Sequence, residues 1–203
     1  MILRVLTTVS CAAAMAVSTA GPASAATVTY QTGAVLTTCD LFAGITPQPA
    51  TLETRFDAPD SLATGTTVTP AGVSGVLQFG EGPHAYLTAF GYDGFRGHVD
   101  LGLAATGATL SGPVAGGLTV PEQIFPAGGV LPVQFGQEPG AVVPSLTAGA
   151  PGTATVRVTT PATFTLEVHQ KATGVWKPRT MTCNIKVTNP PQNPAFSPSI
   201  PVT

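Results

Sequence analysis

Residues 154–169, ATVRVTTPATFTLEVH, carry the pattern that decides the fold. Ala154, Val156 and Val158 alternate with polar neighbours, and the same alternation resumes after Thr160-Pro161. Because successive side chains of a strand point to opposite faces of a sheet, a period of two predicts strands with one buried face. The segment therefore predicts half-buried β-strands separated by a break at the proline.

The residues on either side extend this pattern. Residues 172–176 have the form of a hairpin tip and lead into a strand near residues 179–187. Alternation or short apolar runs predict further strands over residues 27–39, 52–56, 73–79 and 95–103. Pro83 near the start and Gly91 just past the end predict one short helix over residues 84–90. Between residues 107 and 152, glycine and proline divide the chain into short extended pieces.

The composition agrees with a β-rich fold. Charged residues make up only 9% of the chain, and 23 glycines and 20 prolines supply turns. The chain is also too apolar for intrinsic disorder. We therefore predict an all-β fold with one short helix, namely an antiparallel, immunoglobulin-like β-sandwich, with a β-barrel as the second choice.

The N-terminal residues have the features of a signal peptide. A basic start at Met1–Arg4 precedes an apolar stretch over Val5–Ala20, which is too short to serve as a membrane anchor. Ala23-Ser24-Ala25 then has the small-residue form that signal peptidase accepts. We expect residues 1–25, with Cys11, to be removed and the protein to be secreted. An N-terminal transmembrane anchor is the alternative reading.

The remaining chain is long enough for one domain. Residues 26–188 contain all the predicted strands and no internal repeat, so they are expected to form a single β-rich domain. Residues 189–203 are rich in proline and form a C-terminal tail. Because proline cannot donate to a ladder of hydrogen bonds, this tail is expected to be extended or disordered and not to join a central strand.

Cys39 and Cys183 lie at opposite ends of the predicted domain. In an oxidising compartment, two such cysteines are expected to pair. A metal pair or a catalytic thiol would need further ligands or a histidine at a recognisable spacing, and neither cysteine has one nearby. We predict a Cys39–Cys183 disulfide, which places the two segments side by side.

The charged residues exclude several function classes. Without Arg4, the chain has seven basic and ten acidic residues. Binding of nucleic acid needs a clustered basic surface, so this charge balance argues against that function. His84, His98 and His169 lie far apart without metal-ligand spacing, and we expect them to face solvent. No nucleophile elbow, calcium loop or phosphate loop is present. No cofactor is expected, and the chain is predicted not to be an enzyme.

Two groups of aromatic residues are candidates for contact surfaces. Trp176 is the sole tryptophan and lies among Lys171, Lys177 and Arg179 near the hairpin tip, a set that could contact a sugar face or an anionic lipid headgroup. The alternative is that Trp176 folds back on the sheet. Tyr86 and Phe90 are four residues apart on the helix, and together with Tyr92 and Phe95 they are expected to pack onto the core.

The order of these features resembles a known family. The Cys39–Gly44 segment, Pro47-Gln48-Pro49 before the residue 52–56 strand, and Thr182-Cys183 at the end are similar to the secreted actinobacterial domain of unknown function 6801. The similarity extends over residues 91–103, over Pro151-Gly152 to Val156, and over Phe164 to Leu166. The resemblance implies a secreted β-rich domain closed by one disulfide. It implies no catalytic residue.

Two function classes follow from the sequence. The first is a non-enzymatic binding or structural domain that acts at or near the bacterial cell envelope, either released or loosely associated with the wall. Its partners would be cell-wall polysaccharide or envelope lipid, and no transmembrane segment is expected in the mature chain. The alternative is a secreted hydrolase whose site is assembled from distant loops.

Overall fold

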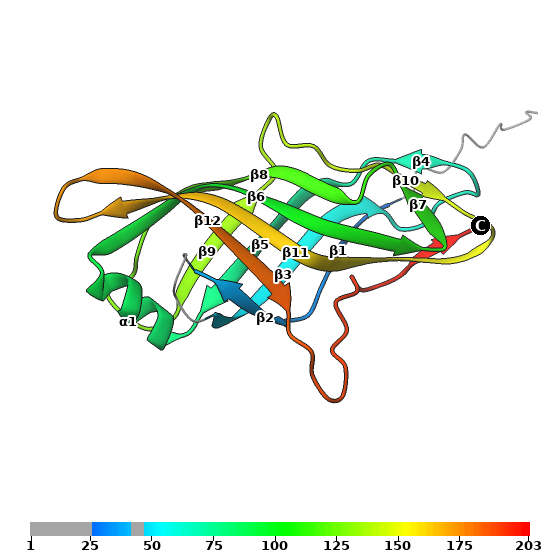
Figure 1. Ribbon diagram of the computed structural model, residues 1–203. Helices are drawn as coiled ribbons and strands as arrows, with labels where there is room; N and C mark the ends of the chain where they lie inside the picture. Colours follow the sequence, from blue (N-terminus) through cyan, green and yellow to red (C-terminus); the bar gives the residue numbers. More distant parts are fainter. Residues whose placement is uncertain (1–25, 42–46) are drawn as a thin grey trace, which may run out of the picture.

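The computed structural model describes residues 26–41 and 47–203. The predicted signal peptide, residues 1–25, and Cys11 within it lie outside the described residues. Most of the described chain is antiparallel β-sheet, with helix α1 at one end of an elongated molecule (Figure 1).

The main sheet contains ten strands and closes on itself. The strands that form its wall are β2 (Val35–Asp40), β3 (Gln48–Pro59), β5 (Ala71–Phe79), β6 (Tyr92–Thr106), β8 (Val114–Ile124), β9 (Leu131–Gly136), β11 (Gly152–Gln170) and β12 (Val175–Ile185). They pair in the order β3-β2-β12-β11-β6-β8-β9-β5, and β5 returns to pair with β3. β1 (Thr27–Gln31) pairs with the C-terminal half of β3, from Arg55 to Pro59.

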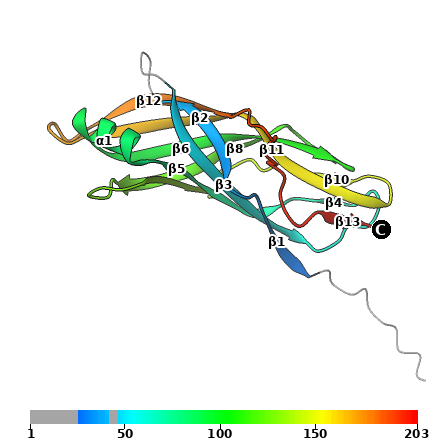
Figure 2. The same ribbon diagram turned by 90° about the horizontal axis from the view of Figure 1, so that it is seen from below.

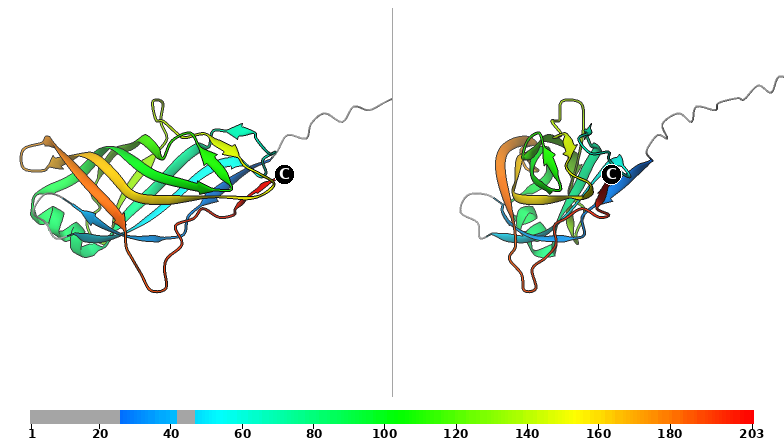
Figure 3. Two further views of the ribbon diagram at one scale, coloured as in Figure 1. Left: turned by 45° about the vertical axis from the view of Figure 1, so that its right-hand side comes forward. Right: turned by 90° about the vertical axis from the view of Figure 1, so that its right-hand side faces the viewer.

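This pairing confirms the predicted fold class. The sheet is antiparallel throughout the ladders of its wall, and the described residues contain one short helix and a Cys39–Cys183 disulfide. A sandwich has open sheet edges, whereas the β3–β5 ladder closes the ring, so the arrangement is the barrel-like one of the two expected forms. The strands are seen to curve around a common centre in Figure 3.

Alternating side chains fill the interior of the closed sheet. On β11, Phe164, Leu166 and Val168 are buried, while the residues between them face outward. The other wall strands supply matching apolar residues, so the centre is a packed core. Its largest fully buried side chains include Tyr30, Phe79, Phe95, Phe164, Leu52, Leu77, Leu101, Leu118 and Leu131.

The predicted break at Pro161 does not end the strand. β11 runs from Gly152 to Gln170, and its register with β6 shifts between Val158 and Ala162. A bulge accommodates the residue that cannot donate a ladder hydrogen bond, so the two expected strands are one.

The Cys39–Cys183 disulfide is confirmed. The two cysteines lie directly opposite each other in the β2–β12 ladder, although 144 residues separate them in sequence. Both side chains are buried. The bond therefore joins an early strand to the last strand of the wall.

Helix α1 (Glu81–Ala89) covers one end of the closed sheet (Figures 1 and 2). Gly91 follows it with φ +76°, a conformation that favours glycine and ends the helix as predicted. Pro83, His84 and Leu87 form its buried face. The expectation that Tyr86 and Phe90 pack onto the core is wrong, because both side chains are exposed.

The C-terminal tail packs against the opposite end. β13 (Ile200–Val202) pairs antiparallel with the start of β11, and the Phe196 ring lies 4.8 Å from the Phe56 ring. Phe196, Ile200 and Val202 are buried, so the proline-rich tail is extended but belongs to the folded unit. A small sheet of β4 (Thr67–Val68), β10 (Leu146–Ala148) and β7 (Ala108–Leu110) lies at the same end (Figure 1).

Candidate functional site

The hairpin of β11 and β12 carries the predicted contact residues, but it divides them between two faces. Trp176 is half-buried on the outer face, directly opposite His169. Lys177 and Arg179 lie opposite Val168 and Leu166, whose side chains point inward, so the two cations take the other face of β12. Lys171 is exposed in the turn. The four residues therefore do not form one surface around Trp176.

Trp176 instead contacts side chains from neighbouring strands. The guanidinium carbon of Arg96, on β6, lies 4.3 Å from the centroid of the indole ring. The His169 ring is 4.8 Å from it, with the two planes tilted by 47°. A cation above an indole face is attracted by the ring quadrupole, so Arg96 helps to fix the orientation of Trp176. The indole lies back across the sheet and is still partly exposed.

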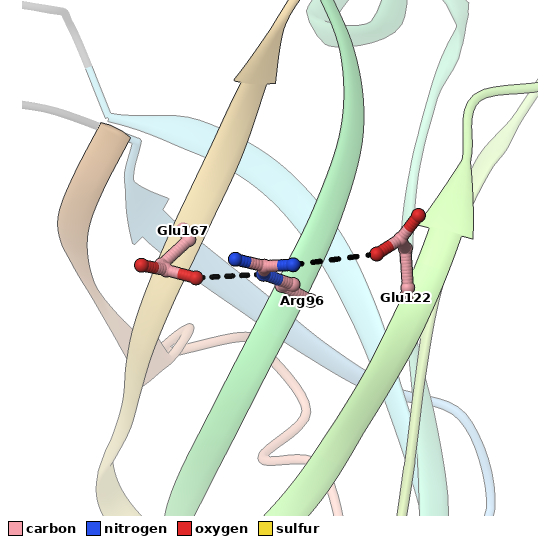
Figure 4. Close-up of polar contacts among 3 residues, drawn as sticks. All are labelled: Arg96, Glu122 and Glu167. Atoms are coloured by element: carbon pink, nitrogen blue, oxygen red, sulfur yellow. Dashed lines mark hydrogen bonds and ion pairs between the residues drawn. The ribbon is translucent and has the colours of Figure 1, made fainter. Parts of the chain in front are cut away.

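Arg96 is held in turn by two carboxylates. Its Nε donates to Glu167 Oε2 at 2.6 Å, and its Nη1 donates to Glu122 Oε2 at 3.4 Å. Figure 4 shows the guanidinium between the two glutamates, one on β11 and one on β8. The hydrogen bond to Glu167 is the largest cause that raises the pKa of Arg96, while burial opposes it. Because all three side chains are 40–56% exposed, solvent screens the pairs and their main effect is orientation.

A second polar pair completes this surface. Asp93 Oδ1 lies 2.5 Å from His169 Nδ1, which holds the imidazole in place beside Trp176. We call the outward-facing group formed by Trp176, Arg96, His169, Glu167, Glu122 and Asp93 the Trp176 face. The face combines an apolar ring with hydrogen-bond donors and carboxylate acceptors. Such a combination suits a ligand that has both C–H faces and hydroxyl groups.

An open polar groove lies over a different part of the wall. It has a volume of about 570 Å³ and runs along the outside of β3, β5 and β9. Two of its lining residues are joined by a hydrogen bond, in which Arg55 Nε donates to Ser74 Oγ at 3.1 Å. Glu53 and several glutamines contribute further polar groups; the outward-facing lining residues include Glu53, Arg55, Gln78 and Gln134.

The three histidines are not grouped. His84 is buried, against the expectation that it faces solvent, and its Nδ1 lies 2.8 Å from the Gly129 carbonyl oxygen. His98 is exposed, and His169 belongs to the Trp176 face. Across residues 26–41 and 47–203, no group of three or more His, Cys, Asp or Glu residues could hold a metal ion. In the same part of the chain, no helix is long and apolar enough to cross a membrane.

The sequence contained one signal for the Trp176 face. Arg96, Glu167 and His169 alternate with buried apolar residues on their strands, which predicts that they point outward. The sequence does not show that β6 lies between β11 and β8, and this order is what brings Arg96 to Glu122 and Trp176. The partners of Trp176 were therefore missed.

Comparison with known proteins gives one match. No curated protein and no solved structure matches the chain. The model of a family of unknown function, DUF6801, matches residues 37–197, which include every wall strand from β3 to β12 and most of β2. This agrees with the resemblance seen in the sequence. The chain belongs to the DUF6801 family.

Proposed function

We propose that this protein is a non-enzymatic extracellular binding domain that acts at or near the cell envelope and contacts envelope polysaccharide through the Trp176 face. The observation that carries the proposal is the half-buried indole of Trp176, which lies among hydrogen-bonding side chains from three neighbouring strands. A sugar ring offers C–H groups to an indole, and its hydroxyl groups suit the carboxylates beside it.

The arrangement of the face supports binding without a large change of shape. Trp176, Glu167 and Glu122 come from β12, β11 and β8 of a closed sheet, and Arg96 on the intervening β6 links all three through its guanidinium group. Side chains that are already oriented lose little conformational entropy when a ligand arrives. A flexible polysaccharide chain can therefore be bound by a surface of modest size.

The buried Cys39–Cys183 disulfide supports an extracellular location. Such bonds persist in oxidising compartments and are rare in the cytosol. The same bond ties β2 to β12, so it also holds the strand that carries Trp176. Loss of the bond is expected to weaken binding through the fold rather than through direct contact.

A pull-down on isolated envelope polysaccharide tests this proposal. Trp176→Ala should reduce retention at least tenfold and leave thermal stability nearly unchanged, because the half-buried side chain lies on the outer face of the sheet and not in the core. Val142→Ala, at an exposed valine between β9 and β10, is the matched control and should be retained like the wild type. Equal retention of the wild type and Trp176→Ala would contradict the proposal. A large loss of stability would instead assign Trp176 to the core.

The polar groove is the feature that favours the alternative, a secreted hydrolase. Its carboxylate Glu53 lies near Arg55 and Ser74 in an open depression. A hydrolase would turn over envelope polysaccharide and lose that activity in Glu53→Gln. The proposed binding domain should release no soluble fragment in either form.

A further inference from the structure

The α1 end of the molecule exposes more apolar surface than a packed domain requires. Five large apolar side chains are exposed there, between 39% for Tyr86 and 63% for Ile124. We call this group the apolar end; its members are Tyr86, Phe90, Ile124, Val130 and Val175. Exposed apolar side chains that gather in one place mark contact surfaces, whereas scattered ones do not.

Specific contacts bring the three segments of the apolar end together. The residue 125–130 loop packs on α1, because His84 Nδ1 contacts the Gly129 carbonyl oxygen at 2.8 Å and the His84 ring meets Phe125 edge-on. The β11–β12 turn joins the end of the helix through a hydrogen bond of 2.9 Å from Lys171 N to Gly91 O. Figure 2 shows α1 and this hairpin at the same end of the sheet.

The fold does not need Tyr86 and Phe90 for its core. Leu87, fully buried, and Pro83 already attach α1 to the sheet. The rings of Tyr86 and Phe90 lie 4.6 Å apart and contact each other, and both are exposed. Phe90 is 56% exposed at the last turn, where a polar residue would serve the helix equally well. The aromatic pair is therefore available to a partner.

Basic residues border this aromatic pair. A backbone hydrogen bond to Gly91 holds Lys171 next to the C-terminal end of the helix. Arg179 Nη2 donates to the Tyr92 hydroxyl at 3.3 Å. Both basic residues are thus held next to Gly91 and Tyr92, the two residues that follow Phe90. Of the nearby carboxylates among the described residues, Asp93 is engaged with His169 and Glu122 with Arg96, while Glu81 lies at the far end of the helix. We therefore expect a partner that has a negatively charged surface and an apolar interior.

We propose that the apolar end docks on an anionic lipid bilayer, with Tyr86 and Phe90 between the headgroups and Lys171 near the lipid phosphates. Aromatic and aliphatic side chains flanked by lysine and arginine are the composition of interfacial membrane contacts. A second copy of the chain is a poorer occupant, because a two-fold interface would bring Lys171 and Arg179 near their own symmetry mates. Tyr86, Phe90 and Lys171, on which this contact depends, do not belong to the Trp176 face, so this partner is separate from polysaccharide binding.

Vesicle co-sedimentation of the oxidised protein tests the proposal. Vesicles of phosphatidylcholine with one-third phosphatidylglycerol should bind the wild type at least tenfold more strongly than vesicles of phosphatidylcholine alone. The double variant Tyr86→Ser/Phe90→Ser should lose that binding at least tenfold, and Lys171→Glu should lose it severalfold. Val142→Ser, which removes an even more exposed apolar side chain elsewhere, should bind as the wild type does.

Three results would overturn the proposal. The first is no binding of the wild type to anionic vesicles, and the second is equal binding by the wild type and the double variant. The third is a concentration-dependent dimer that the double variant abolishes, which would assign the apolar end to a second copy. Trp176→Ala should leave vesicle binding unchanged, and the double variant should leave polysaccharide retention unchanged, so failure of one proposal is distinguishable from failure of the other.

Discussion

At the end of the sheet where the chain finishes, Phe196, Ile200 and Val202 are buried, whereas at the α1 end Tyr86 and Phe90 are exposed. Both ends of the closed sheet must be covered, because an open end leaves core side chains in contact with water. The tail covers one end with β13 and with a segment that lies against β1 and β11. Helix α1 covers the other end with its buried face, and it leaves further apolar side chains exposed.

The two ends differ in whether their apolar side chains stabilise the fold or are available for contact with a partner. A proline-rich tail has few conformations to lose, so three buried apolar side chains are enough to hold it against the sheet. Nothing comparable covers Tyr86 and Phe90 among the described residues. We infer that the tail end serves the fold and that the α1 end serves a partner.

Removal of the disulfide should have the largest effect, because it loosens the wall that joins the two ends. For a separation of 144 residues, the chain-entropy relation predicts that Cys39→Ala/Cys183→Ala lowers the free energy of unfolding by roughly 5 kcal/mol. Urea denaturation of the oxidised wild type and the double variant measures the difference. A loss below about 1 kcal/mol would show that the β2–β12 ladder holds without the bond.

Phe196→Ala should have the next largest effect and should act on the tail end. The ring is buried against Phe56, and removal of a buried phenylalanine costs about 3–5 kcal/mol. Val187→Ala is the control, because this valine lies in the same C-terminal part of the chain and is 95% exposed. If both variants unfold at the same urea concentration, the tail is not part of the stable unit.

The sequence predicted the tail end and the helix only in part, for physical reasons. Proline content predicts an extended backbone, but it does not show that Phe196 and Ile200 will find a surface to cover. The spacing of Tyr86 and Phe90 predicts a shared helix face, which the ring contact confirms, but spacing does not say which face meets the core. The equally spaced Pro83 and Leu87 occupy that position.

The strands were predicted more completely than the surfaces they build. Alternation identifies which side of β11 and β6 is buried, because it depends only on local geometry. It does not give the order of strands in the sheet, and it does not reveal that Lys177 and Arg179 oppose buried partners while Trp176 faces outward. The Cys39–Cys183 bond was predictable because it needs only two cysteines and an oxidising compartment.

Tyr30 offers a smaller test at the tail end, with a dependence on pH. Its ring stacks on Phe56, its hydroxyl donates to the Pro59 carbonyl oxygen at 2.8 Å, and burial, with Asp60 as the second cause, raises its pKa above the usual 10.0. The neutral form is therefore favoured in the folded state, so this contribution is complete below pH 10 and is lost as pH rises through the raised pKa.

Tyr30→Phe should cost about 1 kcal/mol at pH 7 through the lost hydrogen bond. It should also lose less stability than the wild type between pH 9 and pH 11. Urea denaturation across this range measures both effects. Parallel losses in the two proteins above pH 10 would show that Tyr30 does not titrate differently in the folded state.

The smallest effect on the free energy of unfolding is expected at the α1 end. Tyr86→Ser/Phe90→Ser removes two aromatic side chains, yet both are exposed and their mutual contact contributes only about 0.2–0.5 kcal/mol. The free energy of unfolding should therefore fall by no more than about 1 kcal/mol. Leu87→Ala is the control on the same helix and should cost about 2–5 kcal/mol, since this leucine is fully buried. If the double variant costs as much as Leu87→Ala, the two aromatic residues are part of the core, and the α1 end is closed as the tail end is.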